Sequence, residues 1–280
     1  MADIQKSSPV AKALMYLVMI LFAVLAIYPI LWLILQSFKT TQEYITSSKL
    51  ALPKIWFFGN YPYTWSMGKF GVLMLNSVFY TAVTVGAVII LGFMAGFAFA
   101  KIKSRATPFL HGMFIIGILL TLQSIMVPLF LMVNAVGLYN TRLGVLIPYV
   151  GLGLPMGVYL GTEFIKSIPG ALIESARIDG AKYLKIFTAI ILPMTAPVAI
   201  TLGILTFTGT WNEFMLINIL TSDDAIKSIP VGIGRFSGAL ASDYGKQFSA
   251  LVIGMIPMVI FYLIFRKQIT QGVAAGAVKG

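Results

Sequence analysis

The chain has 280 residues, of which 59% are hydrophobic and 10% charged, whereas an ordinary soluble domain is roughly 45–50% apolar and about 25% charged. This balance excludes a water-soluble globular domain and indicates an integral membrane protein. The formal net charge of +11 is compatible with a nucleic-acid partner, but a cytoplasmic excess of Lys and Arg, which orients membrane proteins, explains it better. Cysteine is absent, which excludes a disulfide framework and a thiolate metal site.

Apolar stretches long enough to cross a bilayer recur along the chain. A run of about 18 or more apolar residues can cross a hydrocarbon core near 30 Å thick, and such segments satisfy their own backbone hydrogen bonds as helices. We therefore predict an all-α integral membrane protein with about six spans, at residues 11–35, 73–100, 109–133, 143–164, 187–207 and 249–265. The first run is longer than the apolar region of a signal peptide, so we expect it to be a retained span.

The segment between the first two spans, residues 39–69, is rich in aromatic residues (KIWFFGNYPYTW). Trp and Tyr favour the membrane interface, so we expect an interfacial cover on the external side. We divide the chain into residues 1–70 (the first span and this segment), 71–268 (the membrane core) and 269–280 (a cytoplasmic tail).

The second span carries small residues at helical spacing. Gly92 and Gly96 lie about one turn apart, with Gly86 earlier in the same span. Small residues at this spacing predict that another helix approaches closely.

The positive charges predict the orientation of the chain. The short loop KIKSRATP between the second and third spans carries cations and no acid, which favours the cytoplasm. With both termini in the cytoplasm, cytoplasmic segments hold 12 of the 20 Lys and Arg residues, namely Lys6, Lys12, Lys101, Lys103, Arg105, Lys166, Arg177, Lys182, Lys185, Arg266, Lys267 and Lys279. We expect a multi-pass protein of a bacterial-type plasma (inner) membrane.

A further apolar segment follows the fifth span and reads WNEFMLINILTSDDAIKSIPVGIG. It is too apolar for a free loop and too interrupted for a span. We expect it to fold back on the external side, beside a pathway or under a partner, because re-entrant backbone is tolerated only inside protein or against a water-filled cavity.

The longest cytoplasmic loop, residues 168–193, carries the most specific motif (IPGALIESARIDGAKYLKIFTAIILP). It resembles the permease subunits of binding-protein-dependent importers of the ATP-binding-cassette (ABC) superfamily, which share Glu-Ala-Ala, three residues, Gly, nine residues and Ile-x-Leu-Pro. The residues that match this pattern, with Ser in place of the middle Ala, are Glu174, Ser175, Ala176, Gly180, Ile190, Leu192 and Pro193. The sequence Asp179-Gly180-Ala181 and the ending QGVAAGAVKG resemble the carbohydrate-uptake, maltose-type branch, and the likeness covers about residues 71–280.

This resemblance implies the type I ABC importer permease fold, with a cytoplasmic coupling helix between spans four and five. The helix would insert into a cleft on a nucleotide-binding subunit through Glu174, Ser175, Ala176, Arg177, Asp179, Gly180 and Ala181. The partners implied are a second homologous permease subunit, two ATPase subunits that bind ATP and Mg²⁺, and an extracytoplasmic solute-binding protein. Substrate would cross by alternating access, with this chain forming half of the path for a sugar or oligosaccharide.

The chain has no residues expected to perform catalysis. It lacks a GxxxxGK[ST] phosphate loop, so the ATPase is expected to be a separate chain. The single His cannot complete a Ser-His-Asp triad, and no cluster has metal-ligand spacing. We expect no catalytic residue, no metal and no cofactor in this chain, and no nucleic-acid partner.

Polar residues within or next to the spans are the candidates for a substrate pathway, because such groups are expensive to bury without partners. The candidates are Asn76, Gln123, Asn134, Trp211, Asn212 and Glu213. Asn76 and Gln123 are more typical of hydrogen bonding between helices than of ligand binding. Glu213 is equally compatible with a role near the substrate path or external gate and with helix packing.

Three other functions remain open from the sequence. An ion-coupled secondary transporter would need buried carboxylates, of which the spans hold few. A scaffold protein would form complexes without driving uptake. An ABC importer of a non-sugar solute would share the coupling loop. Which sugar is carried, and whether this subunit contacts it, is open at this point.

Overall fold

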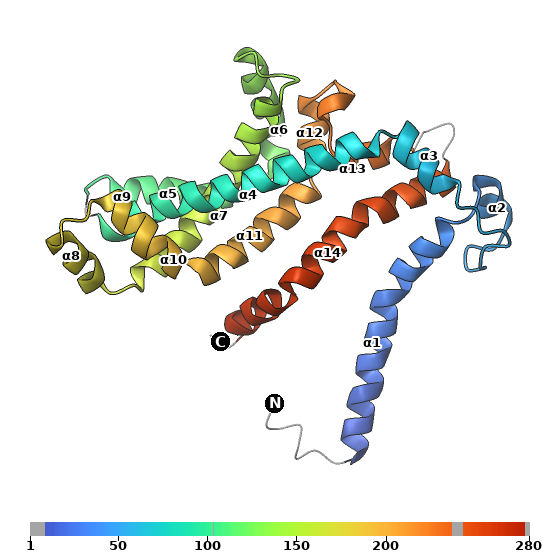
Figure 1. Ribbon diagram of the computed structural model, residues 1–280, viewed down its shortest axis with the longest axis horizontal. Helices are drawn as coiled ribbons and strands as arrows, with labels where there is room; N and C mark the ends of the chain where they lie inside the picture. Colours follow the sequence, from blue (N-terminus) through green and yellow to red (C-terminus); the bar gives the residue numbers. More distant parts are fainter. Residues whose placement is uncertain (1–8, 103, 237–242, 278–280) are drawn as a thin grey trace. The chain divides into compact units, whose positions relative to one another are not determined.

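The computed structural model describes residues 9–102, 104–236 and 243–277, and every regular element in these ranges is helical (Figure 1). The chain divides into two compact units. Unit 1 comprises Met1–Phe70 and Ile233–Ile256, and unit 2 comprises Gly71–Gly232 and Pro257–Gly280.

Unit 1 begins with a long apolar helix, α1 (Pro9–Gln36), followed by the short helices α2 (Thr41–Thr46) and α3 (Asn60–Met67). The start of α14 (Tyr244–Ala277) completes it. None of the most apolar window of α1 is buried. A helix that is apolar all round and unburied in its own chain is suited to lipid or to a partner helix.

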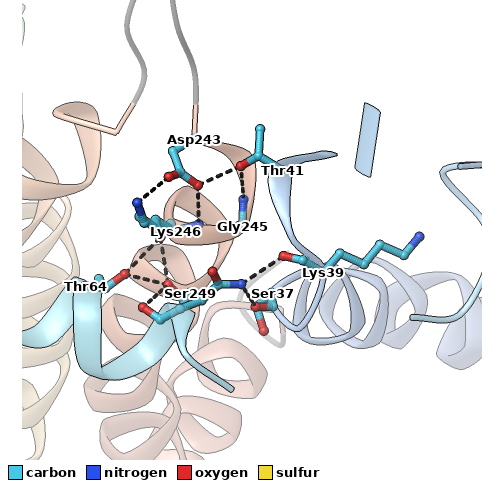
Figure 2. A network of polar contacts seen from close by, with 9 residues as sticks. Ser37, Lys39, Thr41, Thr64, Asp243, Gly245, Lys246 and Ser249 are labelled. Carbon is cyan, nitrogen blue, oxygen red and sulfur yellow. Dashed lines mark hydrogen bonds and ion pairs between the residues drawn. The ribbon is translucent and has the colours of Figure 1, made fainter. Parts of the chain in front are cut away.

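A polar network joins the end of α1 to α3 and to the start of α14 (Figure 2). The amide of Asn60 donates to the carbonyl oxygens of Ser37 at 2.8 Å and Lys39 at 2.9 Å. The hydroxyls of Thr64 and Ser249 lie 2.7 Å apart. A side chain on Gly245 would collide with the Lys39 carbonyl oxygen, so glycine is required where these segments meet.

The same network contains an ion pair beside Thr41 (Figure 2). The ammonium of Lys246 lies 2.6 Å from Oδ2 of Asp243, and the Thr41 hydroxyl donates to Oδ1 at 2.7 Å. Burial opposes the charged form of Asp243, but the hydrogen bonds from Lys246 and Thr41 outweigh it and hold the pKa of this carboxyl below its ordinary value. Lys39 is also buried, and burial lowers the pKa of its ammonium.

Unit 2 contains most of the helices. They are α4 (Phe70–Lys101, whose first residue belongs to unit 1), α5 (Thr107–Ile118), α6 (Leu122–Ala135), α7 (Arg142–Lys166), α8 (Gly170–Ile178), α9 (Tyr183–Ile186), a π turn (Phe187–Ile191), α10 (Leu192–Met194), α11 (Ala196–Trp211), α12 (Met215–Leu220), a 3₁₀ turn (Asp224–Ile226), α13 (Ile229–Gly234, which ends in unit 1) and the later part of α14. Figure 1 shows α8 and α9 near one end of α4.

Four helices are long and apolar enough to span a membrane, and two bent pairs bring the number to as many as six within the described residues. The four are Pro9–Gln36, Phe70–Lys101, Arg142–Lys166 and Tyr244–Thr270. This agrees with the prediction of about six spans at nearly the predicted positions.

The third and fifth predicted spans are not straight helices, which corrects the sequence-based prediction. Helices α5 and α6 meet at 109°, because Thr121 takes an extended conformation and begins a new helix. The helical stretch Tyr183–Met194 meets α11 at 78°. Here the backbone widens into the π turn before Pro193, and Pro193 and Pro197 cannot donate to a regular helical ladder.

Helices α4 and α7 cross at backbone contact, as the small residues predicted. A Cβ added to Gly92 would lie 2.8 Å from the carbonyl carbon of Gly157, and one added to Gly96 would lie 2.8 Å from the amide nitrogen of Thr162. Real Cβ atoms do not approach so closely, so any side chain would push the helices apart.

Candidate functional site

The helix–turn–helix of residues 170–186, here called the coupling hairpin, is built by a glycine turn. Helix α8 ends at Ile178, Asp179 is its C-cap residue, and Gly180 follows at φ +79°, in the left-handed region. The amide of Gly180 donates to the Arg177 carbonyl at 3.0 Å and that of Ala181 to the Ala176 carbonyl at 2.9 Å. This is the Schellman arrangement, which satisfies the last carbonyls of α8 and reverses the chain into α9.

One face of the coupling hairpin packs onto the membrane helices. Ile173 and Ile186 are buried in a cluster with Phe97 of α4 and Ile165 of α7. The ring of Phe97 lies 6.3 Å from that of Tyr183. The hairpin is therefore fastened to α4 and α7 by a continuous apolar core.

A polar contact braces the hairpin internally. The Arg177 guanidinium donates to the Tyr183 hydroxyl at 3.1 Å and lies 5.1 Å from the centre of its ring. Arg177 thus joins α8 to α9 across the glycine turn.

Other side chains of the hairpin are exposed, and several of them are apolar. Ile178, at the end of α8, is 86% exposed, Leu184 is 65% exposed and Leu172 is 43% exposed. Glu174 and Ser175 are also exposed. Exposed apolar side chains on a segment outside the predicted spans indicate a docking surface. The sequence motif identified the turn, but it gave Ile178 no role.

Lys101 connects the end of α4 to the start of the hairpin. Its ammonium donates to the carbonyl oxygens of Ile168 at 2.6 Å and Lys166 at 3.4 Å. These carbonyls lie at the C-terminal end of α7, where a cation is favoured by the helix dipole. Lys101 therefore ties α4 to the end of α7 and to the segment between α7 and α8.

Asn76, a predicted pathway residue, holds a loop in place. Its amide donates to the carbonyl oxygens of Ala225 at 2.8 Å and Lys227 at 2.9 Å, and its Oδ1 accepts from Arg142 at 3.1 Å. The Tyr80 hydroxyl donates to the Ile226 carbonyl at 2.8 Å. Asn76 is 2% exposed, so its bonds clamp the strap, here residues 221–229, onto α4 and α7.

Replacing Asn76 by leucine is expected to destabilise the chain. Two strap carbonyls and one Arg142 donor would lose their partner, at a cost of about 1–3 kcal/mol for each unsatisfied group. Asn134 on α6 is exposed, so Asn134→Leu is the matched control. We expect the thermal unfolding midpoint in mild detergent to fall clearly for Asn76→Leu and little for Asn134→Leu; equal midpoints would contradict the clamp.

Glu213 joins α7, α11 and α12. Its carboxylate accepts the Tyr149 hydroxyl at 2.6 Å and the amides of Leu216 at 2.6 Å and Ile217 at 3.1 Å. The amides belong to the first turn of α12, where a carboxylate is a favourable cap. Leu216 and Ile217 are fully buried, so the segment after α11 folds back into protein.

Glu213 also borders a cleft of about 340 Å³ between α7 and α11. The cleft is lined by Tyr149, Leu152, Gly153, Met156, Leu205, Thr206, Gly209, Thr210 and Glu213. Of the sequence-based candidates it contains Glu213 alone. The hydroxyls of Tyr149, Thr206 and Thr210 were not predicted, because nothing in the sequence shows that α7 and α11 share this face.

The other predicted pathway residues lie apart. Trp211 is 3% exposed and lines an apolar groove of about 650 Å³ with Phe207 and Phe261. Asn212 is exposed, and its amide donates to the Thr208 carbonyl at 2.9 Å. Gln123 and Asn134 are exposed on α6. The six candidates therefore do not form one site. In the described part of the chain, no three His, Asp or Glu residues are placed to hold a metal ion.

Residues 88–274 match the model of a protein family described as the binding-protein-dependent transport system inner membrane component. The chain belongs to this family. This importer permease is 33% identical to a putative ABC transporter permease protein of a Caldicellulosiruptor species, over 95% of this chain and 96% of that protein. It is 32% identical to the diacetylchitobiose uptake system permease protein of Streptomyces coelicolor, over 94% and 88% of the two chains. It is 31% identical to the trehalose/maltose transport system permease protein of Thermococcus litoralis, over 93% and 94%.

A solved structure supports the fold of the permease. It is that of a bacterial ABC transporter involved in the import of the acidic polysaccharide alginate, with a TM-score of 0.80, 21% identity and coverage of 94% of this chain and 97% of that one. The family assignment confirms the recognised resemblance and makes the protein a multi-pass membrane component of an ABC importer. Such components work with an ATPase and a solute-binding protein. The ion-coupled transporter hypothesis finds no support.

Proposed function

We propose that this permease forms half of the translocation path of an importer for a sugar or oligosaccharide. The observation that carries the proposal is that several relatives are named as transport proteins for saccharides. These saccharides include diacetylchitobiose, trehalose, maltose and products of starch degradation. These relatives match at least 91% of the chain, so the likeness extends well beyond the coupling loop that importers of other solutes share.

The proposed complex contains a second, homologous permease subunit, two nucleotide-binding subunits and an extracytoplasmic solute-binding protein. ATP and Mg²⁺ would bind to the nucleotide-binding subunits. Both termini of this chain would lie in the cytoplasm, together with the coupling hairpin and the loop that follows α4. The Lys and Arg excess of these segments supports this orientation.

The coupling hairpin is the proposed contact with the ATPase. The proposed contact residues are those of the family motif and its turn, Glu174, Ser175, Ala176, Arg177, Asp179, Gly180 and Ala181. Because the hairpin shares an apolar core with Phe97 and Ile165, movement of the ATPase subunits would shift α4 and α7 together with it. ATP-driven closure of the ATPase would thus change the side of the membrane to which the path opens, and hydrolysis would return the path to its starting state.

Lys101 offers a test of whether movement of the ATPase is passed through the coupling hairpin to α4 and α7. In Lys101→Met, the carbonyls of Lys166 and Ile168 lose a charged donor, a type of bond worth about 1.5–3 kcal/mol. We expect solute uptake per ATP hydrolysed to fall several-fold, with the ATPase still attached. Lys101→Arg should restore most of the ratio, because a guanidinium can also donate to two carbonyls.

The control for this test is Lys166→Met, which removes an exposed ammonium that pairs with Glu163 at 2.7 Å. Exposed pairs contribute about 0–1 kcal/mol, so the uptake ratio should hardly change. A normal ratio of uptake to ATP hydrolysis in Lys101→Met, measured in proteoliposomes with the complete importer, would show that Lys101 does not pass movement of the hairpin to α4.

The experiment that tests the proposed function is purification of the chain from its native membrane in mild detergent, followed by identification of the proteins that accompany it. Recovery of an ATPase and a second permease, with ATP hydrolysis stimulated by a sugar-loaded binding protein, would support the proposal. Hydrolysis stimulated only by a non-sugar solute would contradict the substrate, and recovery of the chain alone would contradict the complex.

A further inference from the structure

Helix α11 presents two chemically different sides. One side lines the apolar groove through residues such as Ile200 and Phe207. Around the rest of the helix, Thr206 and Thr210 line the cleft, and Thr208 and Asn212 are exposed. Polar side chains inside a membrane are disfavoured against lipid and usually face a bundle interior or a water-filled space. A polar path therefore fits this side of α11 better than the side that lines the groove.

The cleft on this side has unused hydrogen-bonding capacity. In the described part of the chain, the structure gives no partner to the hydroxyls of Thr206 and Thr210, which lie one helical turn apart. The Glu213 carboxylate accepts three hydrogen bonds, and its two oxygens offer about four acceptor positions. One acceptor position therefore stays available at the rim.

The shape of the cleft admits a small polar ring. Gly153 and Gly209 both line the cleft, and a side-chain atom added to Gly209 would meet nothing within 4 Å, so this part of the cleft is open. Leu152 and Met156 supply an apolar wall. The volume of about 340 Å³ lies at the low end of the range for small-molecule sites, about 300–1,000 Å³. The cleft is thus sized for one sugar ring at a time.

We propose that this cleft is a subsite for one ring of a neutral saccharide, and that this subunit contacts the transported substrate directly. The inference rests on the proposed sugar-importer function. Thr206 and Thr210 donate to and accept from ring hydroxyls, Glu213 accepts from one, and the apolar wall covers a face of the ring. The same carboxylate repels uronic and other acidic sugars, so the subsite selects against them.

The chain contains no cysteine, which permits a direct test with single-cysteine variants in the complete importer built from cysteine-free partners. Thr210→Cys places a thiol in the cleft, and Thr208→Cys places one on the same helix outside it. A small water-soluble methanethiosulfonate reagent would label each thiol with and without sugar, under turnover with binding protein and ATP. The sugar is chosen by prior uptake measurements with maltose, trehalose and diacetylchitobiose.

We expect both thiols to react, and the transported sugar to slow labelling of Thr210→Cys at least fivefold and that of Thr208→Cys far less. Labelling of Thr210→Cys without protection would overturn the subsite. Failure of the Thr210→Cys thiol to react at all would also overturn it, because the cleft would then be covered by lipid or by a helix of the second permease.

A second measurement separates this inference from the proposed function. In Thr206→Val and Thr210→Val, loss of one hydrogen bond each, worth about 0.5–1.5 kcal/mol, should lower the rate of uptake below saturation about 2–10-fold while ATPase attachment stays normal. Unchanged uptake in both variants would contradict the subsite but leave the sugar-importer proposal standing. If the unaltered importer took up none of the sugars, the sugar-importer proposal itself would be contradicted.

Discussion

Replacing Gly96 by leucine is expected to prevent α4 and α7 from packing and to leave the chain misfolded. A Cβ at this position would lie 2.8 Å from the amide nitrogen of Thr162 and 2.9 Å from the carbonyl carbon of Gly161. Both atoms belong to the backbone, so no side chain can rotate away and the two helices must separate. We expect a cost of about 3 kcal/mol or more, at the upper end of over-packing effects. The measurement is the fraction of monodisperse protein after extraction in mild detergent.

Gly86 of the same helix provides the control. A Cβ there would meet no atom within 4 Å. Alanine is favoured over glycine in a helix by about 1 kcal/mol, so Gly86→Ala should keep or raise the thermal midpoint of the isolated chain, whereas Gly96→Ala should lower it. A similar fall in both variants would show that α4 does not cross α7 at Gly96.

The sequence predicts the helices and their approximate limits because lipid imposes a simple rule: an apolar segment must be long and must satisfy its own backbone. Gly92 and Gly96 also revealed the close crossing, since few other roles require small residues at that spacing. The bend between α5 and α6 was missed, because it depends on the backbone conformation of Thr121 and a break inside an apolar stretch leaves the hydrophobic pattern unchanged.

The candidate site was less predictable, because its contacts join distant parts of the chain. Asn76 bonds to carbonyls 149 and 151 residues away, and Glu213 to a hydroxyl 64 residues away. A polar residue in a span predicts that some partner exists, but it does not distinguish a strap clamp from a ligand. Lys39, fully buried, had no sequence feature that separates it from an exposed lysine.

Changing Ile178 to aspartate is expected to detach the ATPase from the coupling hairpin and abolish uptake. Ile178 is 86% exposed, so the change should hardly affect folding; surface substitutions usually lie within about 0.5 kcal/mol. In the complex, the variant would lose the burial of an isoleucine side chain, worth about 1.5–3 kcal/mol, and would bring an unpaired charge into the contact. Each 1.4 kcal/mol is about tenfold in affinity, so we expect attachment to weaken about 100-fold or more.

Co-purification of the ATPase with the tagged permease measures this effect, and Ile55→Asp is its control. Ile55 is 72% exposed and lies in the segment expected on the external side, so the same change there should leave attachment intact. Because both substitutions remove an exposed isoleucine and add one negative charge, a general effect of charge or solubility would reduce ATPase recovery equally in both. Loss in Ile178→Asp alone requires that the tip of the coupling hairpin is buried in the ATPase, and normal recovery in that variant would place the contact elsewhere on the cytoplasmic face.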